Sequence, residues 1–368
     1  MNIYEEFEIK QNRAFEIMDD IGVDALMLTS VGNFAWITCG ANNFVACGAE
    51  NGNASAIITK NGGKYIVCDN IEFNRIIDEE AKELGFEVVS FPWHNPNEKF
   101  EVIKKNISHS NMASDIPMHN FIDASAKVDA KRQSLTLSEV ERYKKLGKDV
   151  GKALTETAWI VEPGMSEIEI SSILNHYIIA AGAWPLVSLI AADERIAQYR
   201  HPIPTDKKVK DIFMLVTGAR RNGLIVSASR IVSFSEPSDE IRNKHNAVTY
   251  IDTVFNANSY IGNNISCVFK SGIEAYESMG YKDEWILHHQ GGPTGYKGRE
   301  FRATQDTDFT ICENQAFAWN PSITGTKSED TIISTSNGID FISSDANWPK
   351  IEHQYNGKIY KRQDILII

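Results

Sequence analysis

A chain of 368 residues is longer than one ordinary domain, and two domains account for its length. Hydrophobic content of 42% and charged content of 23% are typical of a soluble globular protein, and the net charge of −12 argues against nucleic acid or an anionic membrane as a partner. No apolar run approaches the roughly 20 residues of a membrane span, and the acidic N-terminus predicts no signal peptide. Five scattered cysteines without CxxC spacing predict reduced thiols and a cytoplasmic location.

The first part of the chain alternates between helix and strand patterns. Apolar residues at helical spacing predict a helix over 5–21 that ends at Gly22. Short apolar runs predict strands over 24–29, 56–59, 64–69 and 86–91. The turn signal Asn61-Gly-Gly predicts that the strands 56–59 and 64–69 form a hairpin. The pattern predicts a compact mixed α/β domain.

A second helix is expected over 71–84, and residues 92–135 are polar and read as irregular. The domain boundary is placed within 125–135, which gives domains 1–130 and 131–368. Two capping boxes follow, Thr136-Leu-Ser-Glu139 and Ser166-Glu-Ile-Glu169. They predict one helix that runs toward Val161 and a second that ends near Gly182.

Several segments in the second domain follow one another in an order that resembles the pita-bread family, which includes methionine aminopeptidase, prolidase, aminopeptidase P and creatinase. They are His201-Pro-Ile-Pro, Met214–Ala219, Gly223–Arg230, His288–Glu300, Trp319-Asn-Pro and Ser328-Glu-Asp-Thr331. The segment Ser30–Gly40 resembles the N-terminal domain of the creatinase-type members. The resemblance implies an α+β fold, with a creatinase-type mixed α/β N-terminal domain before a pita-bread catalytic-type domain. It also implies a homodimer.

In the metal-dependent members of that family, two Asp, one His and two Glu hold two divalent ions. The corresponding positions here are Val216, Ser227, Gly292, Asn320 and Glu329, so only the last Glu is retained. One carboxylate cannot hold two ions. We therefore expect no metal, no cofactor and no dinuclear metal hydrolysis.

Creatinase works without metal, and its catalytic His corresponds to His201. Its two supporting Glu would fall near Ser229 and at Asn320, so both are absent. The chain therefore also departs from an orthodox creatinase.

Polar and ionisable residues nevertheless remain at the positions that line the family's cavity. We expect His201 and His288 to transfer protons and Glu329 to orient one of them or to activate water. Substrate-binding roles are expected for Arg230, His289, Tyr296, Arg299 and Asn320. The expected function is a metal-independent hydrolase that acts on a C–N bond of a small amino-acid-like or amidino compound or of a short peptide.

Other interpretations stay open. The chain could be an inactive pseudopeptidase that binds a peptide or protein, because metal-free pita-bread domains serve elsewhere as interaction surfaces. A metal could instead be bound through His288, His289 and Glu329. Glu329 and Arg230 could also form an internal ion pair without a catalytic role.

Overall fold

The computed structural model describes residues 1–107 and 111–368 and divides them into two compact units. The first contains Met1–Glu139 and Asn222–Leu224, and the second contains Val140–Arg221 and Ile225–Ile368. The division therefore falls near the start of the long helix α6 (Leu137–Ile160). Among the described residues, no helix combines the length and the apolar character needed to cross a membrane.

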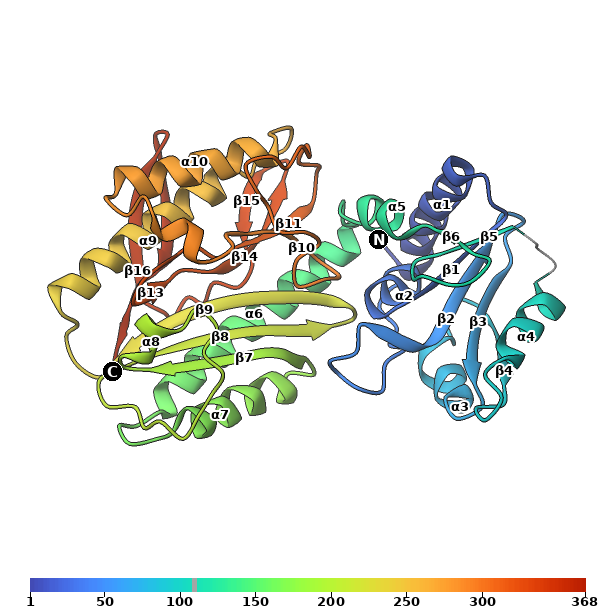
Figure 1. Ribbon diagram of the computed structural model, residues 1–368, viewed down its shortest axis with the longest axis horizontal. Helices are drawn as coiled ribbons and strands as arrows, with labels where there is room; N and C mark the ends of the chain where they lie inside the picture. Colours follow the sequence, from blue (N-terminus) through green and yellow to red (C-terminus); the bar gives the residue numbers. More distant parts are fainter. Residues whose placement is uncertain (108–110) are drawn as a thin grey trace. The chain divides into compact units, whose positions relative to one another are not determined.

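The first unit is built on a mixed six-stranded sheet in the order β4-β3-β2-β1-β5-β6, with helices beside it (Figure 1). Its strands are β1 (Ala25–Ser30), β2 (Asn51–Thr59), β3 (Lys64–Asp69), β4 (Glu87–Phe91), β5 (Met112–Ser114) and β6 (Ile122–Asp123). Its helical segments are α1 (Ile3–Ile21), α2 (Val31–Ile37), α3 (Phe73–Arg75), the π-helical η1 (Ile76–Glu80), α4 (Glu98–Asn106) and α5 (Ser125–Lys131).

The clearest sequence signals of this unit are confirmed. Helix α1 begins at the side-chain cap Asn2 and ends at Gly22, whose φ of 79° is left-handed. Strands β2 and β3 form the predicted antiparallel hairpin. The helix expected over 71–84 is wrong in extent, because regular helix stops at Glu80. The irregular assignment of 92–135 is also wrong, since α4, β5, β6 and α5 lie there; its residues 108–110 lie outside the described part of the chain.

The second unit contains two four-stranded sheets, ordered β18-β9-β8-β7 and β10-β11-β14-β15. Helix α7 packs on β7, and α9 packs on α10 and on strands of the C-terminal part (Figure 1). The strands are β7 (Trp184–Ala192), β8 (Ile212–Arg221), β9 (Leu224–Ser233), β10 (Gly291–Thr294), β11 (Gln315–Trp319), β12 (Ser322–Ile323), β13 (Thr326–Lys327), β14 (Asp330–Thr335), β15 (Gly338–Phe341), β16 (Lys350–Tyr355), β17 (Lys358–Gln363) and β18 (Leu366–Ile367). The remaining helices are α7 (Glu167–Ala180), α8 (Arg195–Gln198), α9 (Asp239–Asn258), α10 (Ile265–Ser278) and the 3-10 turn η2 (Glu284–Leu287).

Both predicted capping boxes are confirmed. Glu139 Oε2 accepts from the Thr136 amide at 2.6 Å, and the Glu139 amide donates back to Thr136 Oγ1 at 3.3 Å. Ser166 and Glu169 form the equivalent pair at the start of α7. These caps satisfy amides that have no partner within the helix, so they fix where each helix begins.

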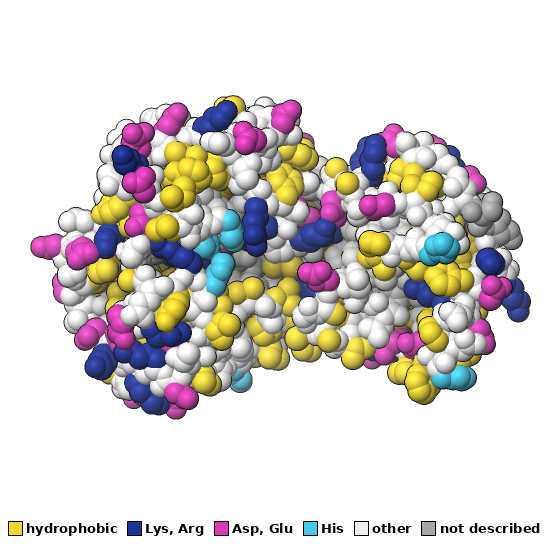
Figure 2. All heavy atoms as spheres, viewed as in Figure 1, with side chains coloured by type: hydrophobic (Ala, Val, Ile, Leu, Met, Phe, Trp, Pro, Cys, Tyr) yellow, Lys and Arg dark blue, Asp and Glu magenta, His cyan; other side chains and the backbone are white. Residues whose placement is uncertain are grey.

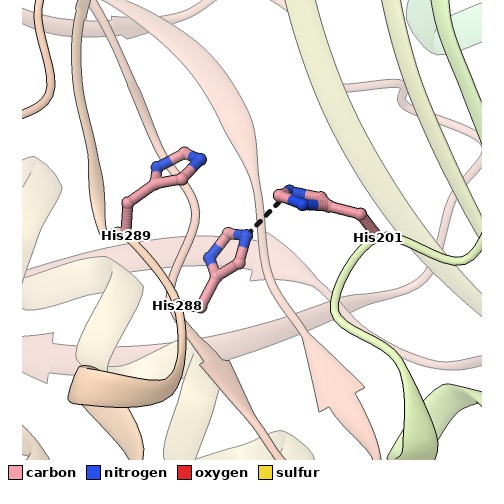
Figure 3. Close-up of side chains that lie close together, drawn as sticks. All are labelled: His201, His288 and His289. Atoms are coloured by element: carbon pink, nitrogen blue, oxygen red, sulfur yellow. Dashed lines mark hydrogen bonds between the residues drawn. The ribbon is translucent and has the colours of Figure 1, made fainter.

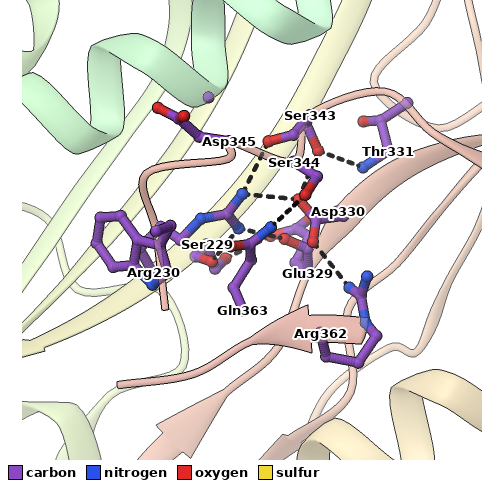
Figure 4. A network of polar contacts seen from close by, with 12 residues as sticks. Ser229, Arg230, Glu329, Asp330, Thr331, Ser343, Ser344, Asp345, Arg362 and Gln363 are labelled. Atoms are coloured by element: carbon purple, nitrogen blue, oxygen red, sulfur yellow. Dashed lines mark hydrogen bonds and ion pairs between the residues drawn. The ribbon is translucent and has the colours of Figure 1, made fainter. Parts of the chain in front are cut away.

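The two sheets of this unit meet where β9 lies beside the start of β14, with Ser229 paired to Glu329. Side chains alternate along a strand, so the next residues, Arg230 and Asp330, point to the other side. There the Arg230 guanidinium donates to Asp330 Oδ1 at 2.8 Å (Figure 4). Arg362 bridges Asp330 Oδ2 at 2.9 Å and Asp252, and all four side chains are buried. This network holds the strands that carry Ser229 and Glu329.

Candidate functional site

Three histidines from two loops of the second unit come together (Figure 3). His201 lies between α8 and β8, while His288 and His289 lie between η2 and β10. The Nε2 atoms of His201 and His288 are 3.0 Å apart, and the rings of His288 and His289 stack with centroids 4.4 Å apart. His201 is exposed and His288 is only 8% exposed. One imidazole is therefore accessible while its partner is buried behind it.

The loop that carries His288 and His289 is held by Gln290. Its Nε2 donates to the His288 carbonyl at 2.7 Å and to the Trp285 carbonyl at 2.9 Å. The Tyr276 hydroxyl donates to Gln290 Oε1 at 2.9 Å. Because every contact of this amide fixes backbone or a buried hydroxyl, Gln290 positions the two imidazoles rather than a ligand.

The loop that carries His201 is fixed through its neighbour Arg200. The Arg200 guanidinium donates to Glu284 Oε2 at 2.7 Å and to Thr324 Oγ1 at 2.9 Å. Glu284 begins η2, the turn that leads to His288. The same ion pair thus joins the two loops on which the histidines lie.

All three imidazoles are held in the neutral form. Burial, together with the positive charge of Lys327, lowers the pKa of His201 below its usual value. The same two causes lower the pKa of His288 to about 2. Burial and the charge of Arg299 lower the pKa of His289 to about 4. At neutral pH each ring is therefore uncharged and has one nitrogen that donates a hydrogen bond and one that accepts.

Glu329, the one retained family ligand, is surrounded by cationic and hydroxyl donors. Arg299 Nη2 lies 2.8 Å from Oε1, while Lys327 Nζ and Ser229 Oγ lie 3.2 and 2.6 Å from Oε2. Burial alone would raise the pKa of this carboxyl, but the two charges and the hydrogen bonds lower it to about 2. Its described contacts are to these donors, so we assign it to holding Arg299 and Lys327 rather than to orienting a histidine.

The residues at the family's metal positions do not fit a pair of ions. Val216 packs in an apolar cluster, and Ser227 Oγ accepts from Arg299 Nη1 at 3.2 Å. At Gly292 a Cβ atom would lie 2.7 Å from the Phe301 carbonyl oxygen, so no ligating side chain can be placed there. Asn320 is a neutral amide, and Glu329 already contacts two cations. The donor set lacks the carboxylates that a dinuclear centre requires.

The three imidazoles themselves have the spacing of a metal site, since one nitrogen from each lies within 4.8 Å of the others. The surroundings do not suit a divalent cation. Lys327 acts on all three rings with positive charge, and the negative charge of Glu329 opposes it. The Gly291 amide donates to His289 Nδ1 at 3.2 Å, which leaves the proton of the neutral ring on Nε2. The considered metal site of His288, His289 and Glu329 is not formed in the described contacts, because the Glu329 carboxylate contacts Arg299 and Lys327 and is not grouped with the imidazoles.

Other expected site residues are placed differently. Arg230 is 2% exposed and pairs with Asp330, so we assign it to the buried network instead of to a substrate carboxylate. Glu329 and Arg230 do not form an ion pair in the described contacts, because Arg230 Nη1 donates to the Glu329 backbone carbonyl at 3.2 Å and not to its carboxylate. The sequence indicates this placement, because Arg230 directly follows Ser229 and neighbouring side chains of a strand point to opposite sides. Tyr296 is buried in the turn after β10, where its amide donates to Glu300.

Asn320 remains a candidate. It follows β11, and its amide N–H donates to the Gln290 carbonyl at 3.1 Å, beside the histidine pair. Its side chain is 3% exposed, and its Oδ1 has no hydrogen-bond partner among the described residues. Lys327 was expected to line the cavity but was given no role there, although it lies two residues before Glu329 and contacts its carboxylate at 3.2 Å. Lys327 ends the short strand β13, and side chains two residues apart in an extended chain point to the same side, so this spacing indicates that Lys327 lies beside Glu329.

Comparison with known proteins agrees with the fold. The model of metallopeptidase family M24 matches residues 141–341. An uncharacterized peptidase of Staphylococcus haemolyticus is 22% identical over 84% of this chain and 94% of its own length, and the uncharacterized peptidase YqhT of Bacillus subtilis is 22% identical over 90% and 96%. The structure of an Xaa-Pro dipeptidase from Bacillus anthracis superposes with a TM-score of 0.78 at 20% identity, covering 98% of this chain and 100% of that one. The pita-bread α+β fold is thereby confirmed, and the chain belongs to metallopeptidase family M24.

Proposed function

We propose that this protein hydrolyses a C–N bond in a short peptide or small amino-acid-like compound without a dinuclear metal centre. The observation that carries the proposal is the pair of neutral imidazoles, His201 and His288, whose Nε2 atoms lie 3.0 Å apart. Membership of a peptidase family supports hydrolysis as the reaction class. The ion pairs of Glu329 with Arg299 and Lys327 support a reaction that does not use the family's metal pair.

The proposed chemistry is general base and acid catalysis. An imidazole of the pair accepts a proton from water as the water oxygen forms a bond to the carbonyl or amidino carbon. The resulting imidazolium returns that proton to the nitrogen as the C–N bond breaks, so the ring ends neutral. In this proposal exposed His201 faces the substrate and accepts the proton, while buried His288, whose pKa is lowered to about 2, stays neutral and orients His201 through the 3.0 Å contact between their Nε2 atoms.

Turnover by variants tests this assignment. The protein, dialysed against a chelator, would be assayed on Xaa-Pro dipeptides, other dipeptides and amidino amino acids. We expect His201→Gln and His288→Gln to lower kcat/KM on the identified substrate by about a hundredfold or more, the usual contribution of a proton-transferring group. His176→Gln, on the exposed face of α7, is the matched control and should leave turnover unchanged.

Two results would contradict the proposal. Unchanged turnover in the double variant of His201 and His288 would exclude the imidazole pair as the proton-transferring groups. Turnover that requires added manganese, zinc or cobalt would exclude the metal-independent reaction. Saturable peptide binding with no turnover of any compound would instead support the binding-module interpretation.

A further inference from the structure

Positive charge has accumulated where the family places its two cations. Arg299 and Lys327 contact opposite oxygens of Glu329, and Arg302 also acts on His201 and His289. Figure 2 shows Lys and Arg side chains beside histidines on the drawn face of the second unit. Arg299 and Lys327 outnumber the one carboxylate that both contact, and the imidazoles are neutral. The cluster therefore has a net positive charge that a bound anion would neutralise.

The same cations have hydrogen-bond donors to spare. An ammonium group has three donor hydrogens, and the described contact of Lys327 Nζ is to Glu329 Oε2 alone. The Lys327 side chain is only 5% exposed, so water has little access to the remaining hydrogens. Arg299 Nε is also buried and has no partner within the described residues. Buried donors of this kind normally have acceptors, so these hydrogens are available to a bound acceptor.

Two more buried polar atoms of this part of the second unit have no hydrogen-bond partner among the described residues. They are His288 Nδ1 and Asn320 Oδ1, which belong to side chains that are 8% and 3% exposed. A group bound beside these side chains would therefore have both hydrogen-bond donors and hydrogen-bond acceptors as neighbours. The combination of spare cationic donors with neutral imidazoles differs from a metal site, which needs acceptors and negative charge.

We infer that Lys327 and Arg299 anchor the carboxylate of a small substrate, so that an anion binds where the family binds metal. A carboxylate supplies one negative charge and two acceptor oxygens, which match the unused hydrogens of Lys327 Nζ and Arg299 Nε. Glu329 keeps the two cations in place and limits their excess charge. The inference rests on the proposed function for its choice of an amino-acid-like or peptide ligand, and it narrows that class to compounds with a free carboxylate close to the scissile bond.

Calorimetric titration of the full-length protein at constant ionic strength tests the inference. The probes are N-acetylglycine and its uncharged analogue N-acetylglycinamide, which differ only at the carboxyl group. We expect saturable binding of the acid and at least about tenfold weaker binding of the amide, as loss of a charge-assisted hydrogen bond implies. Lys327→Met should weaken binding of N-acetylglycine by about tenfold or more. Lys361 lies in β17 and its side chain is 64% exposed, so Lys361→Met should change the affinity for N-acetylglycine by less than about twofold.

A third variant separates binding from misfolding. Glu329→Gln removes the carboxylate that competes for the two cations, so it should tighten binding of N-acetylglycine, a gain that an unfolded protein cannot show. Equal binding of acid and amide, or unchanged binding in both Lys327→Met and Glu329→Gln, would overturn the inference. So would stoichiometric binding of zinc or cobalt that His288→Gln abolishes, because the cluster would then be a metal site. Carboxylate binding without turnover would contradict only the proposed hydrolysis.

Discussion

Gly292 occupies the position at which the family carries its metal-binding histidine, and the backbone around it excludes a side chain. Its φ is +145°, and a Cβ atom would lie 2.7 Å from the Phe301 carbonyl oxygen and 3.0 Å from the Ala303 nitrogen. Both neighbours are backbone atoms, so they cannot rotate away. The exchange of histidine for glycine is therefore built into the packing of β10 and cannot be reversed by one substitution.

This close approach predicts a stability cost for even the smallest side chain. Gly292→Ala should lower the free energy of unfolding by about 2 kcal/mol or more, from the strained φ together with the backbone clash. Denaturant titration measures the change. Gly298→Ala is the matched control in the same segment, because a Cβ there meets nothing within 4 Å. Equal stability of the two variants would show that the segment moves freely and that position 292 could accept a side chain.

The packing of α9 against β16 makes stability depend on pH. His353 Nε2 lies 2.8 Å from Thr249 Oγ1, and burial together with the positive charge of Arg362 lowers the pKa of His353 from 6.5 to about 4. His245 also lowers the pKa of His353, and the negative charge of Asp364 opposes this shift. The unfolded chain takes up a proton near pH 6.5 and the folded chain only near pH 4, so this stabilisation is complete above pH 6.5 and is lost as the pH falls toward 4.

His353→Gln should reduce that dependence. Each unit between the folded and unfolded pKa corresponds to about 1.4 kcal/mol, so His353 accounts for a loss approaching roughly 3 kcal/mol between neutral pH and pH 4. Denaturant titrations at several pH values should therefore show that the free energy of unfolding falls less between neutral pH and pH 4 in His353→Gln than in the unaltered protein. His176→Gln, at an exposed position of α7, should retain the full fall. An unaltered slope in His353→Gln would show that this imidazole is protonated in the folded state.

Elements with strong end signals were predicted well, and elements without them were not. Helices α1, α6 and α7 have side-chain caps that are visible in the sequence. The N-cap residue of helix α4, Asn97, forms no side-chain cap, and β5 is three residues long, so neither element has a pattern that separates it from a loop. The π-helical η1 departs from the 3.6-residue period that predicted a longer helix.

The same distinction applies to the site. The resemblance to the pita-bread family indicated which positions correspond to the missing ligands, because the matching segments keep the family's order and spacing. It could not predict that Arg299 would reach Glu329 or that His201 would meet His288, 87 residues away in sequence. Those contacts depend on how loops close, and the sequence pattern of a loop does not encode its direction. The expected role of Arg230 is wrong for a different reason, because alternation along β9 directs its side chain away from that of Ser229 and toward Asp330.

For the whole molecule, the balance of charge around Glu329 decides whether metal ions stabilise the fold. Any ligand that binds the folded chain and not the unfolded chain raises stability by mass action, by about 4 kcal/mol when its concentration is a thousand times Kd. The family's pair of ions would therefore produce a clear rise in Tm. In this chain Arg299 and Lys327 already contact the one retained carboxylate, so a divalent ion would meet positive charge and too few ligands.

We therefore expect manganese, zinc and cobalt to leave Tm unchanged, and a chelator to leave both Tm and turnover unchanged. Differential scanning calorimetry measures the first, and mass spectrometry of the dialysed protein measures bound metal. A carboxylate ligand such as N-acetylglycine should raise Tm under the same conditions, because it adds the charge that the cluster lacks. Two bound ions per chain, with a matching rise in Tm, would mean that the loops reorganise to expose Glu329. The charges of Arg299 and Lys327 would then have to move away, which makes the same experiment a test of how firmly the site is held.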